Sequence, residues 1–449
     1  LYNVSVSSNL VSSNGGTGIN LWGAGHGEYG YGWGYGYVCN VSVSDNQVSS
    51  NIADGIVVWA GTSYCAWSYL YQSEICHNVV TSNGGNGICL GSNEGGQIYN
   101  VTVSSNFAAF NRGNGIRLYC LGYARIYDTI ISSNTILANN GDGLSISAHG
   151  LEYYSDAIIY NITISSNKIL ANLQNGIYLY SLGYPWGGSG GSCIYGVVLS
   201  NNTISSNNKS GAYVEASYDN PELTYNLVLY ENTISANRQA GIWINGGINA
   251  NLSINSISYN TFGVFYTTTA NNSANNNDIY RNSYGMNVTS DATANAEYNY
   301  WGDYSGPFHE SLNPDGRGNP VNGNGTDLNF IPFLTDSVGE INERPLAELR
   351  VDKTVVATNE TVTFDGSTST DDNEIVYYFF DYGDGKNSSW TDSSTVIHKY
   401  ASAGVYNATL IVMDDLGVTS PDRNQTFITI TVTDSTPPIT IHDLSLIHI

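Results

Sequence analysis

The feature that most constrains the fold is a pattern, Asn-x-apolar-x-x-Asn-x-x-x-Gly-apolar, that occurs ten times in the first two thirds of the chain. The Gly comes one residue early in the last two copies. The first Asn of each copy stands at Asn9, Asn46, Asn78, Asn106, Asn134, Asn167, Asn202, Asn232, Asn255 and Asn277. Because this skeleton persists while the residues between change freely, it indicates stacked structural units.

The spacing and composition of the repeat predict an all-β architecture. Successive first Asn residues lie 22 or 23 residues apart at the end of the series and 28 to 37 apart earlier. The basic unit is therefore about 22 residues with insertions, which is too short for paired-helix repeats. Apolar residues alternate, as in Ile162/Ile164 and Ile177/Leu179, with the period of a strand. Asn, Ser, Thr and Gly are poor interior helix formers. We therefore expect a parallel β-helix of about ten to eleven coils, stacked at roughly 4.8 Å.

In such a stack the repeated Asn has a structural role. Equivalent side chains lie above one another, so their amides can form a hydrogen-bonded ladder. We also expect Asn and Gly to occupy left-handed turn positions, which both tolerate. The expected ladder includes Asn9, Asn46, Asn106, Asn134, Asn167, Asn202 and Asn232.

Residues 1–300 carry these copies and resemble the right-handed parallel β-helix repeats of archaeal and bacterial surface proteins and of polysaccharide-acting enzymes. Residues 301–343 form an expected closing segment and linker, in which Trp301 supplies an apolar plate over the lumen. The run NYWGDYSGP (299–307) is similar to the end of the repeat region in nitrous-oxide-accessory and archaeal cell-surface proteins. Some of those proteins are described as copper-binding, but here only His309 lies near this run, with no Cys or Met beside it, so we do not expect a copper site.

Residues 344–433 have a different composition, with short alternating strands and turn signals that predict an immunoglobulin-like β-sandwich. The runs DGSTSTDD (365–372) and FDYGDG (380–385) resemble a PKD domain, which implies a spacer or adhesive module. Asp371, Asp372, Asp381 and Asp384 fit either turn chemistry or a calcium site. Residues 434–449 are expected to be a linker or a non-native tail.

The charge balance limits the partners. The net charge is −24, with −9 in residues 1–300 and −15 in residues 301–449, which disfavours nucleic acid and anionic membranes. No apolar run reaches transmembrane length, and no cofactor motif is present. The chain begins inside a repeat, so we expect an N-terminally truncated fragment. Sequons such as Asn161 permit glycosylation in a secreted or cell-surface location. Cys65 and Cys76 either form a disulfide or remain free thiols.

Aromatic residues concentrate in the segments between repeats, at 21–39, 58–71, 118–127 and 179–196. All follow the strand after the motif Gly, so they leave the helix from one side. Flat apolar rings beside polar groups suit contact with sugars, whereas packing within the loops or against another chain is the alternative. The candidate carbohydrate-binding residues are Trp22, Trp33, Trp59, Trp67, Tyr184 and Trp186.

Catalysis on this scaffold would require carboxylates that converge on one face. Asp54 and Asp142 share a repeat position but lie three coils apart, about 14 Å, so we assign no catalytic residue. The sequence favours a structural or adhesive surface protein that contacts polysaccharide or surface-layer components. The alternative is a polysaccharide lyase or glycoside hydrolase.

Overall fold

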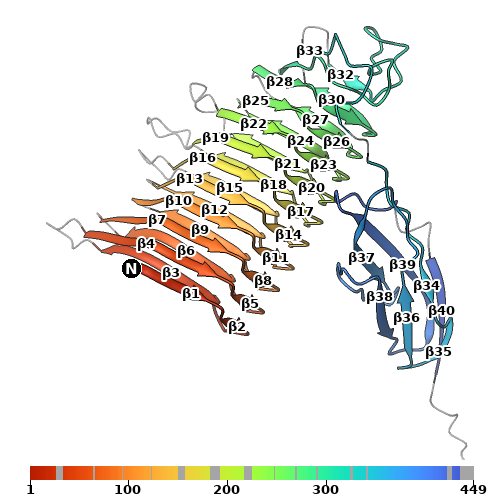
Figure 1. Ribbon diagram of the computed structural model, residues 1–449, viewed down its shortest axis with the longest axis horizontal. Helices are drawn as coiled ribbons and strands as arrows, with labels where there is room; N and C mark the ends of the chain where they lie inside the picture. Colours follow the sequence, from red (N-terminus) through yellow and green to blue (C-terminus); the bar gives the residue numbers. More distant parts are fainter. Residues whose placement is uncertain are drawn as a thin grey trace, which may run out of the picture. The chain divides into compact units, whose positions relative to one another are not determined.

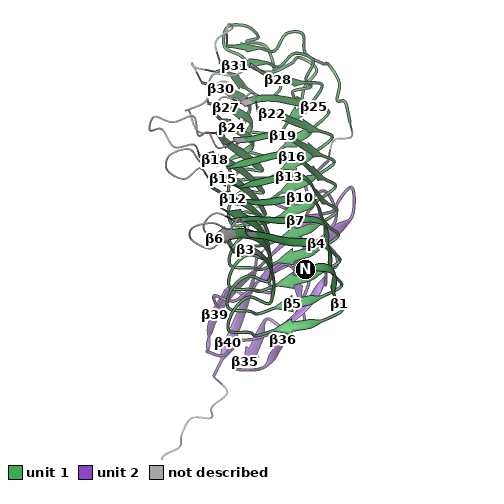
Figure 2. Ribbon diagram, turned by 90° about the vertical axis from the view of Figure 1, so that its left-hand side faces the viewer, with its two compact units in different colours: residues 1–341 green, residues 342–449 purple. Residues whose placement is uncertain are grey.

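The protein is described here by a computed structural model that covers residues 1–26, 34–63, 66–93, 95–122, 124–149, 157–182, 193–216, 225–246, 248–267, 271–289, 292–323, 327–339, 342–421 and 427–434. The chain forms two compact units, residues 1–341 and 342–449 (Figure 2). The first is a right-handed parallel β-helix, and the second is an antiparallel β-sandwich of the PKD type.

Three parallel sheets form the β-helix, and the chain passes through them in turn on every coil (Figure 1). Sheet A consists of β1 (Tyr2–Ser7), β4 (Gly34–Ser44), β7 (Ala66–Cys76), β10 (Gly96–Ser104), β13 (Arg125–Ser132), β16 (Ile158–Ser165), β19 (Cys193–Ser200), β22 (Tyr225–Tyr230), β25 (Ile248–Ser253), β28 (Asn271–Asn275), β31 (Thr293–Asn295) and β33 (Leu328–Asn329).

Sheet B consists of β2 (Leu10–Ser12), β5 (Gln47–Ser49), β8 (Val79–Thr81), β11 (Phe107–Ala109), β14 (Thr135–Leu137), β17 (Lys168–Leu170), β20 (Thr203–Ser205), β23 (Thr233–Ser235), β26 (Ser256–Ser258) and β29 (Asp278–Tyr280). Sheet C consists of β3 (Ile19–His26), β6 (Ile56–Ser63), β9 (Ile88–Asn93), β12 (Ile116–Leu121), β15 (Leu144–His149), β18 (Ile177–Leu182), β21 (Ala212–Ala216), β24 (Ala240–Asn245), β27 (Phe262–Tyr266), β30 (Tyr284–Val288) and β32 (Val321–Asn322).

The two motif Asn residues lie at the corners on either side of sheet B, and their side chains connect successive coils. The backbone N–H and Nδ2 of Asn134 both donate to Oδ1 of Asn167, each at 3.0 Å. Asn139 donates to Asn172 in the same way, which makes a second ladder. Asn134 Nδ2 also donates to the Val103 carbonyl at 2.9 Å, so the ladder satisfies backbone groups that the corners leave unpaired.

The predicted left-handed turn positions are wrong. The residue before each Asn takes the positive φ, for example Ser133 at 57° and Ala138 at 53°. The motif Gly is required for space instead: a Cβ on Gly143 would lie 2.7 Å from the Gly176 carbonyl oxygen. The motif thus encodes close contact between coils at this corner.

Branched aliphatic side chains fill the lumen, and one tryptophan closes it. Ile136, Ile146 and Ile164 are fully buried in a single core that runs through the coils. Trp301 is fully buried in the same core, and its ring lies against Gly285 of the last coils, at the place where the sequence predicts the cap. Asp278 accepts hydrogen bonds from the backbone N–H groups of Val338 and Gly339, which holds the closing segment on sheet B.

Much of the sequence predicted as inserted loops is strand. The segments 21–39 and 58–71 lie largely within β3, β4, β6 and β7, which pair in register, because their residues continue the alternation of the coil strands. Cys76 is a free, buried thiol that donates to Glu74 at 2.8 Å, which excludes it from a disulfide. Cys65 lies outside the described residues.

The PKD unit contains two sheets around its own core. The three-stranded sheet comprises β34 (Arg350–Val351), β36 (Thr361–Asp365) and β38 (Thr395–Lys399), and the four-stranded sheet comprises β35 (Val355–Ala357), β40 (Phe427–Thr433), β39 (Gly404–Asp414) and β37 (Ile375–Asp381). Val362, Phe364 and Phe380 belong to this core and are buried.

Candidate functional site: an aromatic face on sheet C

Every strand of sheet C places alternate residues outside the β-helix. The residue two after each motif Gly and the residue four after it point away from the lumen, and parallel pairing aligns them into two rows. The near row is Asn20, Val57, Cys89, Arg117, Ser145, Tyr178, Tyr213, Trp243, Phe265 and Asn287. The far row is Trp22, Trp59, Gly91, Tyr119, Ser147, Tyr180, Glu215, Asn245, Thr267 and Thr289.

Seven aromatic rings on these rows, together with His149, Phe262 and Tyr284 beside them, form a continuous set of contacts, which we call the sheet C stripe. Successive ring centroids along it lie between 5.0 and 6.3 Å apart. In order, the stripe is Trp59, Tyr119, His149, Tyr180, Tyr178, Tyr213, Trp243, Phe265, Phe262 and Tyr284. It runs from β6 to β30, eight coil steps or about 38 Å.

Small residues between the aromatic ones allow the rings to lie across the face. A Cβ on Gly91 would overlap the ring of Trp59, which therefore lies over the next coil and reaches Tyr119 two coils away. Ser145 and Ser147 on β15 are buried on the outer side of sheet C, with exposures of 6% and 4%. The neighbouring rings are half-buried, so they cover the small residues and keep part of their own surface in solvent.

Polar groups accompany the second half of the stripe. Tyr178 donates to Glu215 Oε2 at 3.2 Å, and Asn245 Nδ2 donates to Tyr213 Oη at 3.4 Å. Asn245 Oδ1 accepts from Thr267 Oγ1 at 2.9 Å. Burial, followed by the charge of Glu215, raises the pKa of Tyr178 above its usual range, so the phenol remains a neutral donor. This half of the face therefore combines an aromatic row with a polar row.

Sheet A carries a second aromatic set with a different geometry. Tyr71, Tyr99, Tyr127, Tyr160 and Tyr195 occupy one row, with ring centroids 4.8 to 5.1 Å apart and interplanar angles of 1° to 7°. Each inner ring is stacked face to face on both neighbours, so mainly ring edges remain for other partners. The rings of the sheet C stripe meet at more varied angles, from 15° to 66°: Tyr178 and Tyr213 are stacked, whereas His149 and Tyr180 meet edge to face. The sheet A set has the regular stacking of a structural ladder, and the sheet C stripe is the less regular of the two aromatic sets.

The candidate residues from the sequence fall in several places. Trp22 and Trp59 lie in register on β3 and β6 of sheet C, and Trp22 is 62% exposed. Trp67 lies on β7 of sheet A, in register with Tyr35, so the structure does not place it with the other two. Trp33, Tyr184 and Trp186 lie outside the described residues.

Sequence reasoning missed most of the sheet C stripe. Four of its rings stand two residues after a motif Gly, a position that the sequence predicts only as part of a strand: Tyr178, Tyr213, Trp243 and Phe265. Aligning the ten copies on their Gly and reading this position down the column would have shown the row.

The aligned acids have a structural explanation. Asp54 Oδ1 accepts from Asn86, and Asp142 Oδ1 accepts from both the backbone N–H and Nδ2 of Asn175, at 2.9 and 3.0 Å. These residues form a third ladder just before sheet C. Burial raises the pKa of Asp142. On the described strands of sheet C, Glu215 is the single carboxylate.

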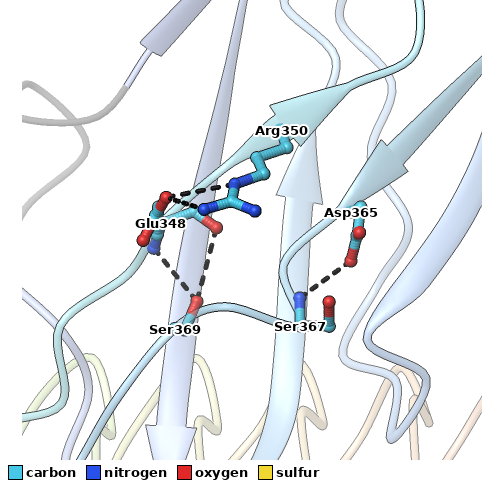
Figure 3. Close-up of polar contacts among 5 residues, drawn as sticks. All are labelled: Glu348, Arg350, Asp365, Ser367 and Ser369. Carbon is cyan, nitrogen blue, oxygen red and sulfur yellow. Dashed lines mark hydrogen bonds and ion pairs between the residues drawn. The ribbon is translucent and has the colours of Figure 1, made fainter.

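The PKD carboxylates mostly close turns. Asp365 accepts from the backbone N–H of Ser367 at 2.9 Å, while the nearby Arg350 pairs with Glu348 (Figure 3). Asp381 and Asp384 accept in the same way from residues two positions later, at 3.0 and 3.1 Å. Turn chemistry accounts for these bonds. Among the described residues, no group of three or more His, Cys, Asp or Glu side chains is arranged to hold a metal ion.

The fold and the exposed aromatic face define a parallel β-helix protein with an attached immunoglobulin-like module. The chain belongs to the right-handed β-helix family: the family described as "Right handed beta helix region" matches residues 39–228 and 186–325. The PKD domain family matches residues 342–432. Within the described residues, no helix has the length and apolarity needed to cross a membrane.

Three relatives show what the chain is similar to. A 106-residue stretch is 37% identical to collagenase ColA of Clostridium perfringens, covering 23% of this chain and only 9% of the collagenase. The PKD1 domain of Vibrio anguillarum Epp is 28% identical over 21% of this chain and all of that domain, with a TM-score of 0.17. The A-module of the mannuronan C-5 epimerase AlgE4 of Azotobacter vinelandii is 13% identical over 68% of this chain and 91% of the module, with a TM-score of 0.32. At these scores the likenesses carry no argument about activity.

Proposed function

We propose that this chain is part of an extracellular structural or adhesive protein that binds polysaccharide along the sheet C stripe. A β-helix followed by a PKD domain fits an extracellular, carbohydrate-associated protein. The β-helix supplies a rigid scaffold, and the PKD unit acts as a spacer or adhesive module.

The unbroken series of ring contacts from Trp59 to Tyr284 is the observation that supports this proposal. A long series of half-buried rings that keep part of their surface in solvent suits an interaction site. Tyr and Trp present both an apolar ring and a polar group, which suits a ligand whose surface alternates between C–H faces and hydroxyls. A glycan along the axis would contact rings in the near row and the polar side chains Glu215, Asn245 and Thr267 in the far row.

Binding of soluble glycans to the whole chain, followed by tryptophan fluorescence and calorimetry, tests the proposal. Trp243→Ala removes a ring at the centre of the stripe, between Tyr213 and Phe265, and should weaken binding about tenfold, or about 1.4 kcal/mol. Tyr127→Leu in sheet A is the matched control and should leave binding unchanged. If both variants bind as the unaltered chain does, the stripe is not the glycan site.

The alternative of assembly against a neighbouring surface protein gives a different result. In that case Trp243→Ala would reduce self-association or capture of a protein partner, and glycans would not change the fluorescence. A glycoside hydrolase uses two carboxylates about 5 to 9.5 Å apart. The described strands of sheet C supply Glu215 alone, so the binding role has the stronger support.

A further inference from the structure

Arg117 is exceptional on the sheet C face. The β-helix unit is acidic, and the chain has a net charge of −24. Among the described strands of sheet C, Arg117 is the one Lys or Arg. It stands in the near row on β12, and its guanidinium carbon lies 4.6 Å from the ring centre of Tyr119. A single cation is therefore held beside the aromatic stripe.

The carboxylate of Asp54, whose charge acts on the neighbouring Cys89 thiol, accepts a hydrogen bond from Asn86 rather than pairing with this cation. Arg117 makes no ion pair with any residue that the structure describes. The adjacent near-row thiol, Cys89, is neutral because burial raises its pKa to about 12. Burial, then Arg117 itself, lowers the pKa of His149, and burial raises the pKa of Tyr119, so both rings are uncharged at neutral pH. Glu215, the acid of the same sheet, is three coils away, about 14 Å.

The side chains next to Arg117 in the near row are small. In its own row, Cys89 precedes Arg117 and Ser145 follows it. Tyr119, beside Arg117, contacts Trp59 on one side and His149 on the other, with centroids 6.3 and 5.5 Å away, so aromatic rings continue past Arg117 in both directions along the stripe. A molecule stacked on these rings would therefore lie beside the guanidinium of Arg117.

We propose that Arg117 makes an anion-selective contact in the polysaccharide site, so that the preferred glycan carries a carboxylate or sulfate on the sugar stacked beside Tyr119. This inference rests on the proposed function of the stripe. A guanidinium presents paired N–H donors that match a carboxylate or sulfate in two-point contact, and such charge-assisted bonds are about twice as strong as neutral ones. The overall negative field acts at longer range and is screened beyond about 8 Å at physiological salt.

Matched polymers that differ only in charge test this assignment. Comparing polygalacturonate with its fully methyl-esterified form measures the effect of a carboxylate on binding. Comparing sulfated laminarin with laminarin measures the effect of a sulfate. The binding constants of the whole chain would be measured by calorimetry at 0.15 M salt. We expect one acidic member of these pairs to bind more tightly than its neutral form by roughly fivefold to tenfold. The pair that shows the preference identifies the anionic group.

Substitution at Arg117 assigns the preference to one residue. Arg117→Gln should abolish the difference between the acidic and neutral forms while keeping the affinity for the neutral form. Arg117→Lys keeps the charge without the planar pair of donors and should retain part of the preference. Arg125→Gln, at an exposed position on sheet A, should change neither affinity. Thermal melts of each variant check that it is folded, and Arg117→Lys carries the test if Arg117→Gln does not fold.

The results separate this inference from the function on which it rests. If neutral and acidic polymers bind equally, or if Arg117→Gln leaves the preference intact, Arg117 is a structural partner of Tyr119 and the inference is overturned. The polysaccharide-binding proposal then stands. If no polymer binds at all, the proposed function fails, and the anion contact fails with it.

Discussion

Replacing Asn134 with alanine should destabilise the β-helix strongly, because it removes a rung from a buried ladder. The side chain of Asn134 makes four hydrogen bonds: Nδ2 donates to Val103 O at 2.9 Å and to Asn167 Oδ1 at 3.0 Å, and Oδ1 accepts from the backbone N–H and Nδ2 of Asn106 at 2.9 and 3.0 Å. The residue is 1% exposed, so water cannot easily replace these partners.

The expected cost follows from the groups that lose their partners. Asn134→Ala leaves the buried backbone N–H of Asn106 and the carbonyl of Val103 without the bonds that now satisfy them. A buried polar group without a partner costs about 1 to 3 kcal/mol, so two of them predict a loss of about 4 kcal/mol. Because each coil is stabilised by its neighbours, we also expect coupling between the two halves to weaken and the denaturant m-value of the main transition to fall.

Equilibrium unfolding of the whole chain in guanidinium chloride, followed by circular dichroism, measures both quantities. Asn140→Ala is the matched control, since Asn140 is an exposed Asn six residues away in the same coil. It should change the unfolding free energy by less than about 0.5 kcal/mol. If the two variants lose equal stability, the ladder contributes nothing beyond ordinary surface asparagine, and this reasoning is refuted.

Three further predictions concern the lumen, the cap and the PKD unit. Ile177→Asp places a charge in the fully buried lumen and should cost several kcal/mol or prevent folding, whereas Ile177→Val should cost about 1 kcal/mol in the same denaturation assay. Trp301→Ala opens the end of the core and should cost about 3 to 5 kcal/mol; a loss below 1 kcal/mol would show that the cap is dispensable. Burial raises the pKa of Asp414 from 3.8 to about 6, so the folded PKD unit binds this proton more tightly than the unfolded chain does. The stability from this group is therefore present below about pH 4 and is lost as the pH rises through 6, by up to about 3 kcal/mol. Subtracting the melting profile of Asp414→Asn from that of the unaltered chain isolates the effect, and equal profiles between pH 4 and 7 would contradict it.

The sequence predicts the scaffold well because the scaffold is periodic. Asn134, Gly143 and Ile146 stand at positions of the repeat that recur in nearly the same order and spacing within each copy, although the copies themselves are 22 to 37 residues apart. A residue that must fit against its own equivalent one coil away leaves a repeated signal. The conformation of each motif position was harder to predict from the sequence. The positive φ falls on the residue before each Asn, such as Ser133 and Ala138, and the type of this residue varies between copies. Different residues accept the strain at this corner because the ladder fixes their neighbours.

The candidate site was harder to predict because it is not periodic. The stripe crosses β15 through His149, because both row positions of that strand are serine, and it passes from the far row at Tyr180 to the near row at Tyr178. No single column of the repeat is therefore aromatic throughout. The aromatic and Gly-rich composition predicts a binding site in the segments between repeats, whereas the rings that contact one another stand on the regular strands of sheet C.

The position of a bound glycan tests the central claim most directly. A crystal structure of the whole chain with an oligosaccharide selected from the binding experiments would show where the sugar rings lie. The account predicts sugar rings over Tyr178, Tyr213 and Trp243 on the outer face of sheet C, with hydroxyls near Glu215 and Asn245. A glycan bound to the tyrosine ladder of sheet A, or to the PKD unit with sheet C bare, would contradict it.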